Sequence, residues 1–300
     1  MERTVSLVID DSLSGHEIKY ILKTKLFMSA RLISKLKNRE DGILLNGEKA
    51  YVVKKVEAGD VLTLKISDQS ERSQNIVPVK GSIDIVYEDD DILLVNKSAG
   101  VPTHPSQDHF YDTLANHTAY YYMTKGLSFT FRPINRLDKN TSGLMLVAKN
   151  SYAHDMAARL HKEGAIIRKY LAIADGMIAE DSGSVEAPIA RAGESVIKRE
   201  VNICGQYART DFRVLERFSG ATLLEVTPKT GRTHQIRVHM AHIGHPLTGD
   251  FLYGKDCGII ARHALHSYKI EFTHPVSGRQ LKFECDMPDD MKRAIKYFDR

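Results

Sequence analysis

The chain has 300 residues, of which 42% are hydrophobic and 27% charged, with a net charge of +4. This composition is typical of a globular protein with a sizeable core, and the length suits two domains. The opening MERTVSLVIDDS lacks the apolar segment of a signal peptide, and no long uncharged apolar run follows, so we expect neither secretion nor a membrane span. The widely spaced Cys204, Cys257 and Cys285 fit neither a disulfide framework nor a zinc site, which predicts a cytoplasmic protein.

Two short helices are predicted near the N-terminus. The sequence SGHE is a capping-box pattern with Ser14 as N-cap, and apolar residues recur after it at helical spacing. A second helix is predicted to begin at Ser29. Arg31, Lys35 and Arg39 then stand at successive i,i+4 positions, which places them on one face of that helix.

These helices carry a basic block without a single acidic residue between positions 19 and 39. Its members are Lys19, Lys23, Lys25, Arg31, Lys35, Lys37 and Arg39. A block of one sign predicts a polyanionic partner. A solvated, lysine-rich surface is the alternative explanation.

The next residues predict a strand, an Asn-Gly turn and a strand in GILLNGEKA (42–50), followed by a strand in VEAGDVLTLKI (56–66). Together with SARLISKLK (29–37), these segments resemble the alpha-L RNA-binding domain, the type found in small-subunit ribosomal protein S-four. The resemblance favours RNA as the partner of the basic block. We therefore assign residues 1–70 to a small α/β RNA-binding domain and the polar residues 71–81 to a linker.

Residues 82–300 are predicted to form a second domain rich in strands. Apolar runs predict strands within 83–88, 92–97, 144–149, 169–176, 210–218, 221–228, 268–275 and 281–288. Helical patterns occur within 111–123, 151–164, 233–244 and 289–298. Because many connections are too short for parallel crossovers, we predict an α+β fold with a mixed, largely antiparallel sheet.

The segment NRLDKNTSG (135–143) places a cation and a carboxylate just ahead of an apolar run. In an extended chain, Arg136 and Asp138 point to the same face, where a strand meets the Thr-Ser-Gly turn. A carboxylate that acts as a nucleophile must be ionised, and a nearby guanidinium favours that form. An arginine two residues away is poorly placed for bidentate pairing, so another arginine is the better partner. Taken alone, the two residues are also explained as solubility charges.

A second polar stretch, TPKTGRTHQIRVHMAHIGHPLTGDFLYG (227–254), opens with a glycine-containing turn before a predicted helix. The N–H groups of such a helix start suit an anion. Three histidines recur at three-residue intervals: His239, His242 and His245. They could bind a metal together with Asp250, but the His-Glu-x-x-His pattern and nearby cysteine ligands are missing. We therefore predict packing or phosphate contacts for them, and no metal.

Four segments, in order, resemble the motifs of the RluA-type family of pseudouridine synthases, which isomerise uridine within RNA. They are NKSAGVPTHPS (96–106), NRLDKNTSG (135–143), RKYLAIADG (168–176) and TGRTHQIRVHMAHIGHPLTGD (230–250). The resemblance spans residues 82–288 and implies the pseudouridine synthase fold for the second domain. Two positions depart from the family pattern, Asn135 where His is usual and Ser98 where Pro is usual. Both departures concern contacts with RNA rather than the reaction.

The resemblance implies a role for four residues. Asp138 is implied to be the nucleophile, and Arg237 the ion-pair partner that keeps it charged. Arg136 is implied to fill the gap that the extruded base leaves in the RNA. Tyr170 is implied to stack on that base, with a role in proton removal left open.

We therefore expect an isomerase that modifies structured RNA, with large-subunit ribosomal RNA as the first substrate and transfer RNA as the alternative. The reaction is neither redox nor energy-driven, and neither GxGxxG nor a Walker loop is present, so we expect no cofactor. A monomer is the default expectation. Two other functions stay open: a non-catalytic RNA-binding or ribosome-assembly factor, and a metal-dependent hydrolase that uses the histidines.

Overall fold

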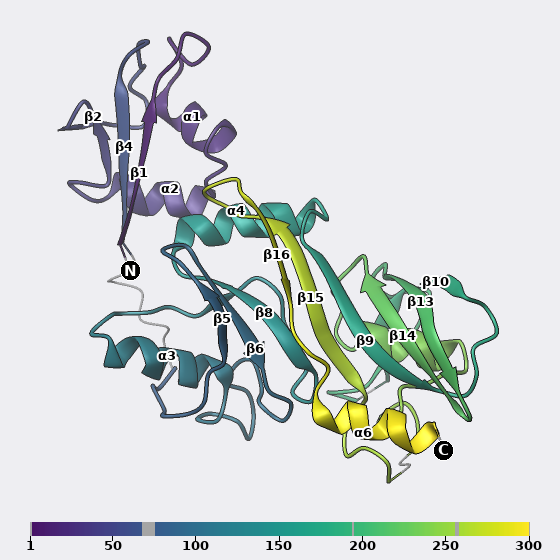
Figure 1. Cartoon of the computed structure of the whole chain (residues 1–300). Helices are drawn as coiled ribbons and strands as arrows, with labels where there is room; N and C mark the ends of the chain where they lie inside the picture. Colours follow the sequence, from purple (N-terminus) through teal and green to yellow (C-terminus); the bar gives the residue numbers. More distant parts are fainter. Residues whose placement is uncertain (1, 68–75, 194, 256–257, 300) are drawn as a thin grey trace.

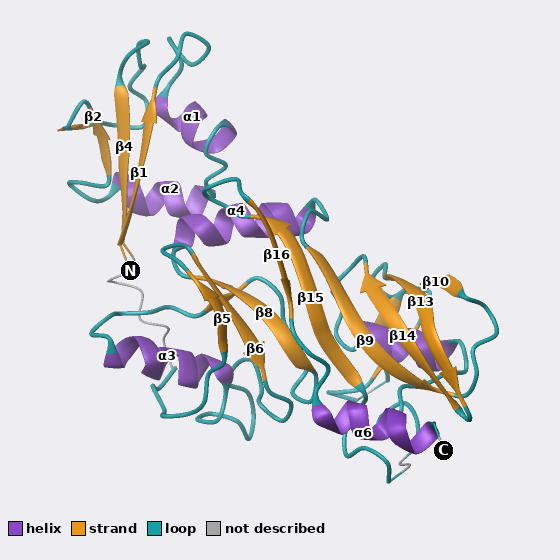
Figure 2. Ribbon diagram, viewed as in Figure 1, coloured by secondary structure: helices purple, strands orange, loops and turns teal. Residues whose placement is uncertain are grey.

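The computed structural model of the chain describes residues 2–67, 76–193, 195–255 and 258–299. A small N-terminal sheet with two helices stands beside a large sheet that carries the remaining helices (Figure 1). The helices lie against the sheets (Figure 2), and the predicted α+β class is confirmed. No helix in this described part of the chain is long and apolar enough to cross a membrane.

The N-terminal sheet is antiparallel and holds two helices. Its elements are β1 (Glu2–Val8), α1 (Ile18–Thr24), α2 (Ala30–Lys37), β2 (Ile43–Leu45), β3 (Glu48–Lys49) and β4 (Val61–Ser67). The strand order is β1-β4-β2-β3, and β1 is not among the predicted elements. The predicted hairpin is confirmed, because Asn46 and Gly47 join β2 to β3 with φ of 53° and 86°.

The two helices differ in how they begin. Helix α2 begins as predicted, with Ser29 as N-cap and its hydroxyl accepting a backbone N–H of the first turn at 3.1 Å. The predicted capping box at Ser14 is wrong, since α1 begins only at Ile18 and has no side-chain cap. Gly15 has φ +79° and its N–H donates to the Val56 carbonyl, so this backbone pairs with a neighbouring loop instead of entering the helix.

The predicted basic row does not extend over one helix. Arg31 and Lys35 lie in α2, but this helix ends at Lys37, and Arg39 lies beyond it. The Arg39 guanidinium donates to the Asp41 carboxylate at 3.0 Å, so an acidic residue just after the block pairs with its last cation. The placement of Arg39 on the helix face is therefore wrong. Four lysines of the segment are exposed: Lys19, Lys23, Lys25 and Lys37.

The large sheet contains ten strands, and a separate two-stranded ribbon lies beside it. The strands of the sheet are β5 (Ile85–Glu88), β6 (Ile92–Lys97), β7 (Arg132–Pro133), β8 (Ser142–Ala148), β9 (Ile167–Asp175), β10 (Ser182–Glu186), β13 (Arg209–Phe218), β14 (Ala221–Pro228), β15 (Leu265–Thr273) and β16 (Gln280–Glu284). The ribbon pairs β11 (Ile189–Arg191) with β12 (Arg199–Val201). The main path runs β10-β13-β14-β9-β15-β8-β6-β5, with β16 paired to β15 and β7 to β8.

All of these pairings are antiparallel except one, between β8 and β15. The parallel pair lies near the middle of the sheet and joins residues that are far apart in the sequence, Ser142 with His266. It thereby brings the segment after NRLDKN against the C-terminal third of the chain. The prediction of a mixed, largely antiparallel sheet is confirmed.

Four helices cover the two faces of the large sheet. They are α3 (Leu114–Thr124), α4 (Ser151–Lys162), α5 (Gln235–His242) and α6 (Asp289–Phe298). Leu114 of α3 and Met240 of α5 belong to one core with Tyr170 and Ala172 of β9. The next residue along β9, Ile173, packs with α6 instead. Helices α5 and α6 therefore lie on opposite faces of β9, as alternation along a strand requires.

Helix α4 lies between the N-terminal elements and the large sheet (Figure 1). Its Tyr152 is buried in the same core as the side chains of α1 and α2. The Asp155 carboxylate accepts the Ser29 N–H at 2.8 Å, and the Arg159 guanidinium lies 3.4 Å from the centre of the Phe27 ring. These contacts fix the N-terminal elements on α4. Of the predicted linker, residues 71–75 lie outside the described residues.

A half-buried carboxylate joins α3 to the large sheet. Glu88 accepts hydrogen bonds from the Tyr121 and Tyr122 hydroxyls at 2.7 and 2.9 Å, and its other partner is the Lys149 ammonium at 2.9 Å. Burial acts to raise the pKa of Glu88, but the bonds from Lys149 and the two tyrosines outweigh it and lower this pKa to about 2. The aromatic run of α3 is therefore part of the packing.

Candidate active site

Asp138 lies on the loop that joins β7 to β8. The Thr141 N–H donates to the Asp138 carbonyl at 3.0 Å, which makes residues 138–141 a turn just ahead of β8. Arg136 is exposed and Asp138 half-buried, both on this loop rather than at a strand end as predicted. Asn135 is buried, and its side-chain oxygen accepts the Leu146 N–H at 2.8 Å. This hydrogen bond connects the loop with β8.

The glycine that closes the motif is required by the sheet. Gly143 is the second residue of β8 and has φ +111°, a region that side chains rarely adopt. A Cβ at this position would lie 2.2 Å from the Ser267 carbonyl oxygen of β15. Because β8 and β15 approach so closely, the loop of Asp138 has a fixed position relative to β15.

Lys97 anchors the other side of the same loop. This lysine is 1% exposed, and its ammonium group donates to the carbonyls of Ser98, Val101 and Lys139 at 2.9, 2.8 and 3.0 Å. The last of these carbonyls belongs to the residue after Asp138. Burial lowers the pKa of Lys97 to about 7. The segment NKSAGVPTHPS therefore supports the Asp138 loop through Lys97. This lysine is not among the predicted site residues.

Arg262 anchors the turn from the C-terminal side. Its Nε and Nη2 atoms donate to the two oxygens of Asp290, in α6, at 2.6 and 3.0 Å. Its Nη1 donates to the carbonyls of Asn140, His263 and Leu265 at 3.1, 3.2 and 3.1 Å. Asn140 lies in the turn that begins at Asp138, so Arg262 connects α6 with that turn. Neither Arg262 nor Asp290 is among the predicted site residues.

The structure brings Arg237 to Asp138, as predicted, but gives it a closer partner. The Arg237 Nη1 atom lies 3.3 Å from Asp138 Oδ2. Its Nε and Nη2 atoms form a bidentate pair with Asp250 at 2.7 and 2.8 Å, and both Arg237 and Asp250 are buried. Burial acts to raise the pKa of Asp250, but the bonds from Arg237 outweigh it and lower that pKa. Asp250 therefore orients the guanidinium that faces Asp138.

A histidine with an unusual backbone also faces Asp138. His234 is the N-cap of α5, with φ +58°, and its Nε2 lies 3.8 Å from Asp138 Oδ2. Its Nδ1 is 2.9 Å from the Tyr253 hydroxyl, which holds the ring in place. Burial lowers the pKa of His234, so the ring is neutral at pH 7. A non-glycine residue in the left-handed region at a cleft is typical of a functional position.

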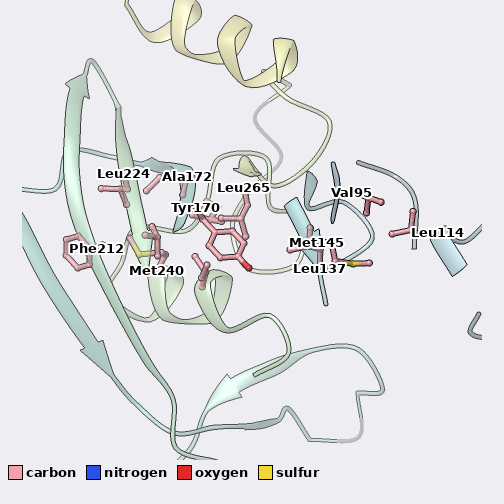
Figure 3. Packing of buried hydrophobic residues seen from close by; sticks show 14 of the residues in the cluster. Val95, Leu114, Leu137, Met145, Tyr170, Ala172, Phe212, Leu224, Met240 and Leu265 are labelled. Carbon is pink, nitrogen blue, oxygen red and sulfur yellow. The ribbon is translucent and has the colours of Figure 1, made fainter. Parts of the chain in front are cut away.

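Tyr170 lies in β9 between the two halves of the main core (Figure 3), with Leu137 and Met145 on one side and Ala172 and Leu224 on the other. The side chain is 5% exposed and lines the same cavity as Asp138. The pairing of β9 with β15 shifts its register next to Tyr170, and such a bulge redirects side chains. Tyr170 and Asp138 therefore line one cavity, and the stacking of Tyr170 on the extruded base stays a prediction.

A cavity of about 520 Å³ contains these residues, a volume within the usual range for ligand sites. Among its lining residues that the structure describes, Asp138 is the only carboxylate. The cations of the lining are Arg136, Lys139, Arg168, Arg232 and Arg237. The cavity thus suits an anionic ligand, and its described lining offers that ligand a single carboxylate.

A second cavity of about 390 Å³ adjoins the first and shares Arg136 and Arg232 with it. Two further arginines, Arg191 of β11 and Arg199 of β12, complete its cationic lining, which contains no carboxylate among the described residues. The ribbon that carries them is fixed, because Ile189 is buried against α5 and the Arg199 N–H donates to the Tyr253 hydroxyl at 2.8 Å. This ribbon is not among the predicted elements.

The predicted histidines do not gather around a cation site. Both ring nitrogens of His239 are used, one by the Thr210 hydroxyl and one by the Ala187 carbonyl, each at 2.9 Å. Asp250 is held by Arg237. A different group, Asp89, Asp91 and His274, brings three ligand atoms together. Its members bind one another or other side chains: His274 lies 2.9 Å from Asp89, and Arg3 2.9 Å from Asp91.

The remaining predicted residues stand apart from the cavity. The N-terminal cations Lys23, Lys25, Arg31, Lys35, Lys37 and Arg39 are not among its lining residues. Their contact with RNA stays a prediction. Of the cysteines, Cys204 and Cys285 are free thiols, and Cys257 lies outside the described residues.

The fold and the cavity define a class of protein: an α+β enzyme with a basic cleft that offers one carboxylate and a buried tyrosine to an anionic substrate. A model of the RNA pseudouridylate synthase family matches residues 91–242. The chain belongs to this family, in its RluA-type branch, and is an RNA pseudouridine synthase, an isomerase.

Relatives align over most of the chain. The uncharacterized RNA pseudouridine synthase YjbO of Bacillus subtilis is 38% identical over 91% of this chain and 96% of its own length. The ribosomal large subunit pseudouridine synthase D of Nitrosomonas europaea is 36% identical over 98% of this chain and 88% of its own length. The solved structure of human RNA pseudouridylate synthase domain containing 1 superposes with a TM-score of 0.56 at 29% identity, covering 69% of this chain and 86% of that one.

Proposed function

We propose that Asp138 is the nucleophile of this pseudouridine synthase and that its substrate is large-subunit ribosomal RNA. The observation that carries the first part is the lining of the cavity: Asp138 is its only carboxylate among the described residues, and Arg237 approaches it at 3.3 Å. The names of relatives such as the enzyme of Nitrosomonas europaea support the second part.

The reaction replaces the N–C bond between uracil and ribose by a C–C bond. The base must first leave its stack, which costs a few kcal/mol and less in a loop than in a duplex. Tyr170 offers a face for stacking, and a base stacked on an aromatic ring gains about 1–3 kcal/mol. Exposed Arg136, which lines both cavities, enters the gap that the base leaves in the RNA.

Asp138 then forms a covalent bond with the nucleoside, either at the sugar or at the ring, which divides one difficult step into two easier ones. The base separates from the ribose and turns, and its C5 bonds to the ribose as N1 did before. The proton that C5 loses is replaced by one on N1, so the net change is an isomerisation. Arg237, oriented by Asp250, keeps a positive charge beside the carboxylate throughout.

The RNA strand is held by arginines outside the chemical step. The second cavity continues from the first and presents Arg191, Arg199 and Arg232 without a carboxylate in its described lining. We assign residues 1–70 to an RNA-binding domain that adds contacts farther along the RNA, because four lysines of their basic block are exposed. The contacts of Tyr152, Asp155 and Arg159 hold this unit on α4.

The proposal is tested by mapping pseudouridines in ribosomal and transfer RNA from cells that lack this protein. We expect specific sites to be lost from large-subunit ribosomal RNA. Expression of the wild type restores them, and Asp138→Asn does not. The matched control is Asp108→Asn, which removes the same charge from an exposed residue with φ +67°, a conformation that asparagine tolerates. Loss confined to transfer RNA overturns the assigned substrate, and restoration by Asp138→Asn overturns the nucleophile.

A further inference from the structure

One buried arginine of the active cavity has no side-chain partner among the residues that the structure describes. Arg168 lies in β9 two residues before Tyr170, so both side chains point to the same face of the strand. It is 7% exposed and lines the cavity that contains Asp138. Its Nε atom is fully buried and makes no hydrogen bond, and no ion pair joins Arg168 to any residue that the structure describes.

Such an arrangement is unfavourable in the free protein. A buried guanidinium loses its hydration, and a partner of opposite charge normally compensates for this loss. The other buried arginines of the site follow this rule, since Arg237 pairs with Asp250 and Arg262 with Asp290. Arg168 does not, so its missing partner is expected to come from the ligand.

The space in front of the guanidinium is open. Arg168 Nη1 and the Nε2 atom of His161 each lie 3.9 Å from the position that a Cβ would take at Gly231, and outside residues 230–232 no described atom is closer to that position. Burial, together with the charge of Arg168, lowers the pKa of His161, so this ring is neutral at pH 7 and does not supply the missing negative charge. The small turn residue leaves room for a ligand group beside both side chains.

We propose that Arg168 binds a backbone phosphate of the RNA next to the extruded nucleotide, an inference that rests on the proposed function of the cavity. A planar guanidinium matches the geometry of a phosphate and pairs with two of its oxygens. A uracil ring or a ribose hydroxyl, both neutral, would leave the buried charge uncompensated. Asp138 is already faced by Arg237. The phosphate clamp fixes the nucleotide by its backbone while Tyr170 contacts the base.

The first experiment separates binding from folding. In Arg168→Met the buried charge is replaced by an apolar chain of similar length, so we expect the melting temperature of the RNA-free protein to stay unchanged or rise. Affinity for an unmodified transcript that contains the target uridine should fall about 10- to 100-fold. Arg168→Lys keeps the positive charge but loses the two-pronged geometry of the guanidinium. Its affinity for the transcript should lie between those of the wild type and Arg168→Met. The control, Arg213→Met, removes an exposed arginine on the other face of the sheet and should keep wild-type affinity.

The second experiment identifies the phosphate. Single neutral methylphosphonates are placed one at a time around the target uridine. We expect one position to weaken binding by the wild type about as much as Arg168→Met does, and to have little further effect on that variant. In Gly231→Ala the added methyl group would lie at ordinary contact distance from Arg168. This variant should show a part of the affinity loss of Arg168→Met without unfolding.

Two outcomes overturn the proposal. If Arg168→Met lowers the melting temperature of the free protein and leaves RNA affinity unchanged, the arginine has a structural role. If every methylphosphonate weakens the wild type and Arg168→Met equally, the residue does not contact a phosphate. Both measurements detect binding without turnover, so they remain valid if Asp138 proves not to be the nucleophile.

Discussion

The lining of the active cavity holds two buried arginines that differ in what the guanidinium meets. Arg237 has Asp250 as a bidentate partner and Asp138 as a third contact. Arg168 meets no carboxylate among the described residues. A cation paired inside the protein already has its charge compensated, whereas an unpaired buried one gains a partner when an anionic ligand binds. We propose that this difference separates the arginine that positions Asp138 from the one that holds the RNA.

Removing the paired arginine should have the largest effect. Arg237→Met leaves the Asp250 carboxylate buried without compensation, so we expect the free energy of unfolding to fall by about 3–5 kcal/mol. Urea denaturation without RNA measures this loss, and Arg168→Met in the same assay should lose nothing. A loss below about 1 kcal/mol for Arg237→Met would contradict the distinction between the two arginines.

The next largest effect is expected at Arg262, which connects α6 to the turn of Asp138. Arg262→Met removes bonds to Asp290 and to the Asn140 carbonyl, so we expect a loss of stability of about 2–3 kcal/mol. Because the turn is displaced while the RNA-binding arginines stay in place, kcat should fall at least 10-fold with little change in KM. Steady-state kinetics at a temperature well below the melting point separates the two constants. A change in KM alone would contradict the positioning role.

Glu88 tests, away from the cavity, whether removing one partner of a charge pair destabilises the fold. Its pKa of about 2 lies below the ordinary value of 4.5, so its stabilising contribution is complete above pH 4.5 and is lost as the pH falls toward 2. Glu88→Gln should lower the free energy of unfolding by about 2 kcal/mol at pH 7. The difference between the two proteins should shrink at pH 3. Equal differences at both pH values would show that the carboxylate charge is not responsible.

The smallest effect is expected from a single arginine of the second cavity. Arg191 is exposed and lines that cavity, so Arg191→Ala should remove one phosphate contact without changing stability. The slope of log affinity against log salt concentration should become shallower by about 0.7–0.9. Arg293→Ala, on the exposed side of α6, serves as the control. An equal change in both variants would mean that the cavity does not follow the RNA path.

Much of the fold is predictable from local patterns. Apolar runs identify the long strands of the large sheet, and Ser29 identifies the start of α2 by its capping hydroxyl. The capping box at Ser14 misleads, because Gly15 adopts a positive φ and pairs with residues some forty positions later in the chain. Patterns within a short segment cannot show such a competing contact.

The candidate site is predictable only in part. The motifs place Asp138, Tyr170 and Arg237 in one cavity, as the structure does. They do not show that Asp250 orients Arg237, or that the described part of the chain offers Arg168 no side-chain partner. These facts depend on which carboxylates the folded chain brings near each guanidinium. Arg168 stands inside a predicted motif, and only its surroundings distinguish it from a surface cation.

The account rests on the covalent role of Asp138, and a single-turnover assay tests it most directly. Purified wild type, Asp138→Asn and Asp108→Asn are each incubated in excess with a transcript that contains the mapped uridine, and pseudouridine is quantified over time. We predict that Asp138→Asn binds the transcript within about threefold of wild-type affinity and forms no pseudouridine, while Asp108→Asn matches the wild type. Pseudouridine formation by Asp138→Asn at a measurable fraction of the wild-type rate would contradict the account.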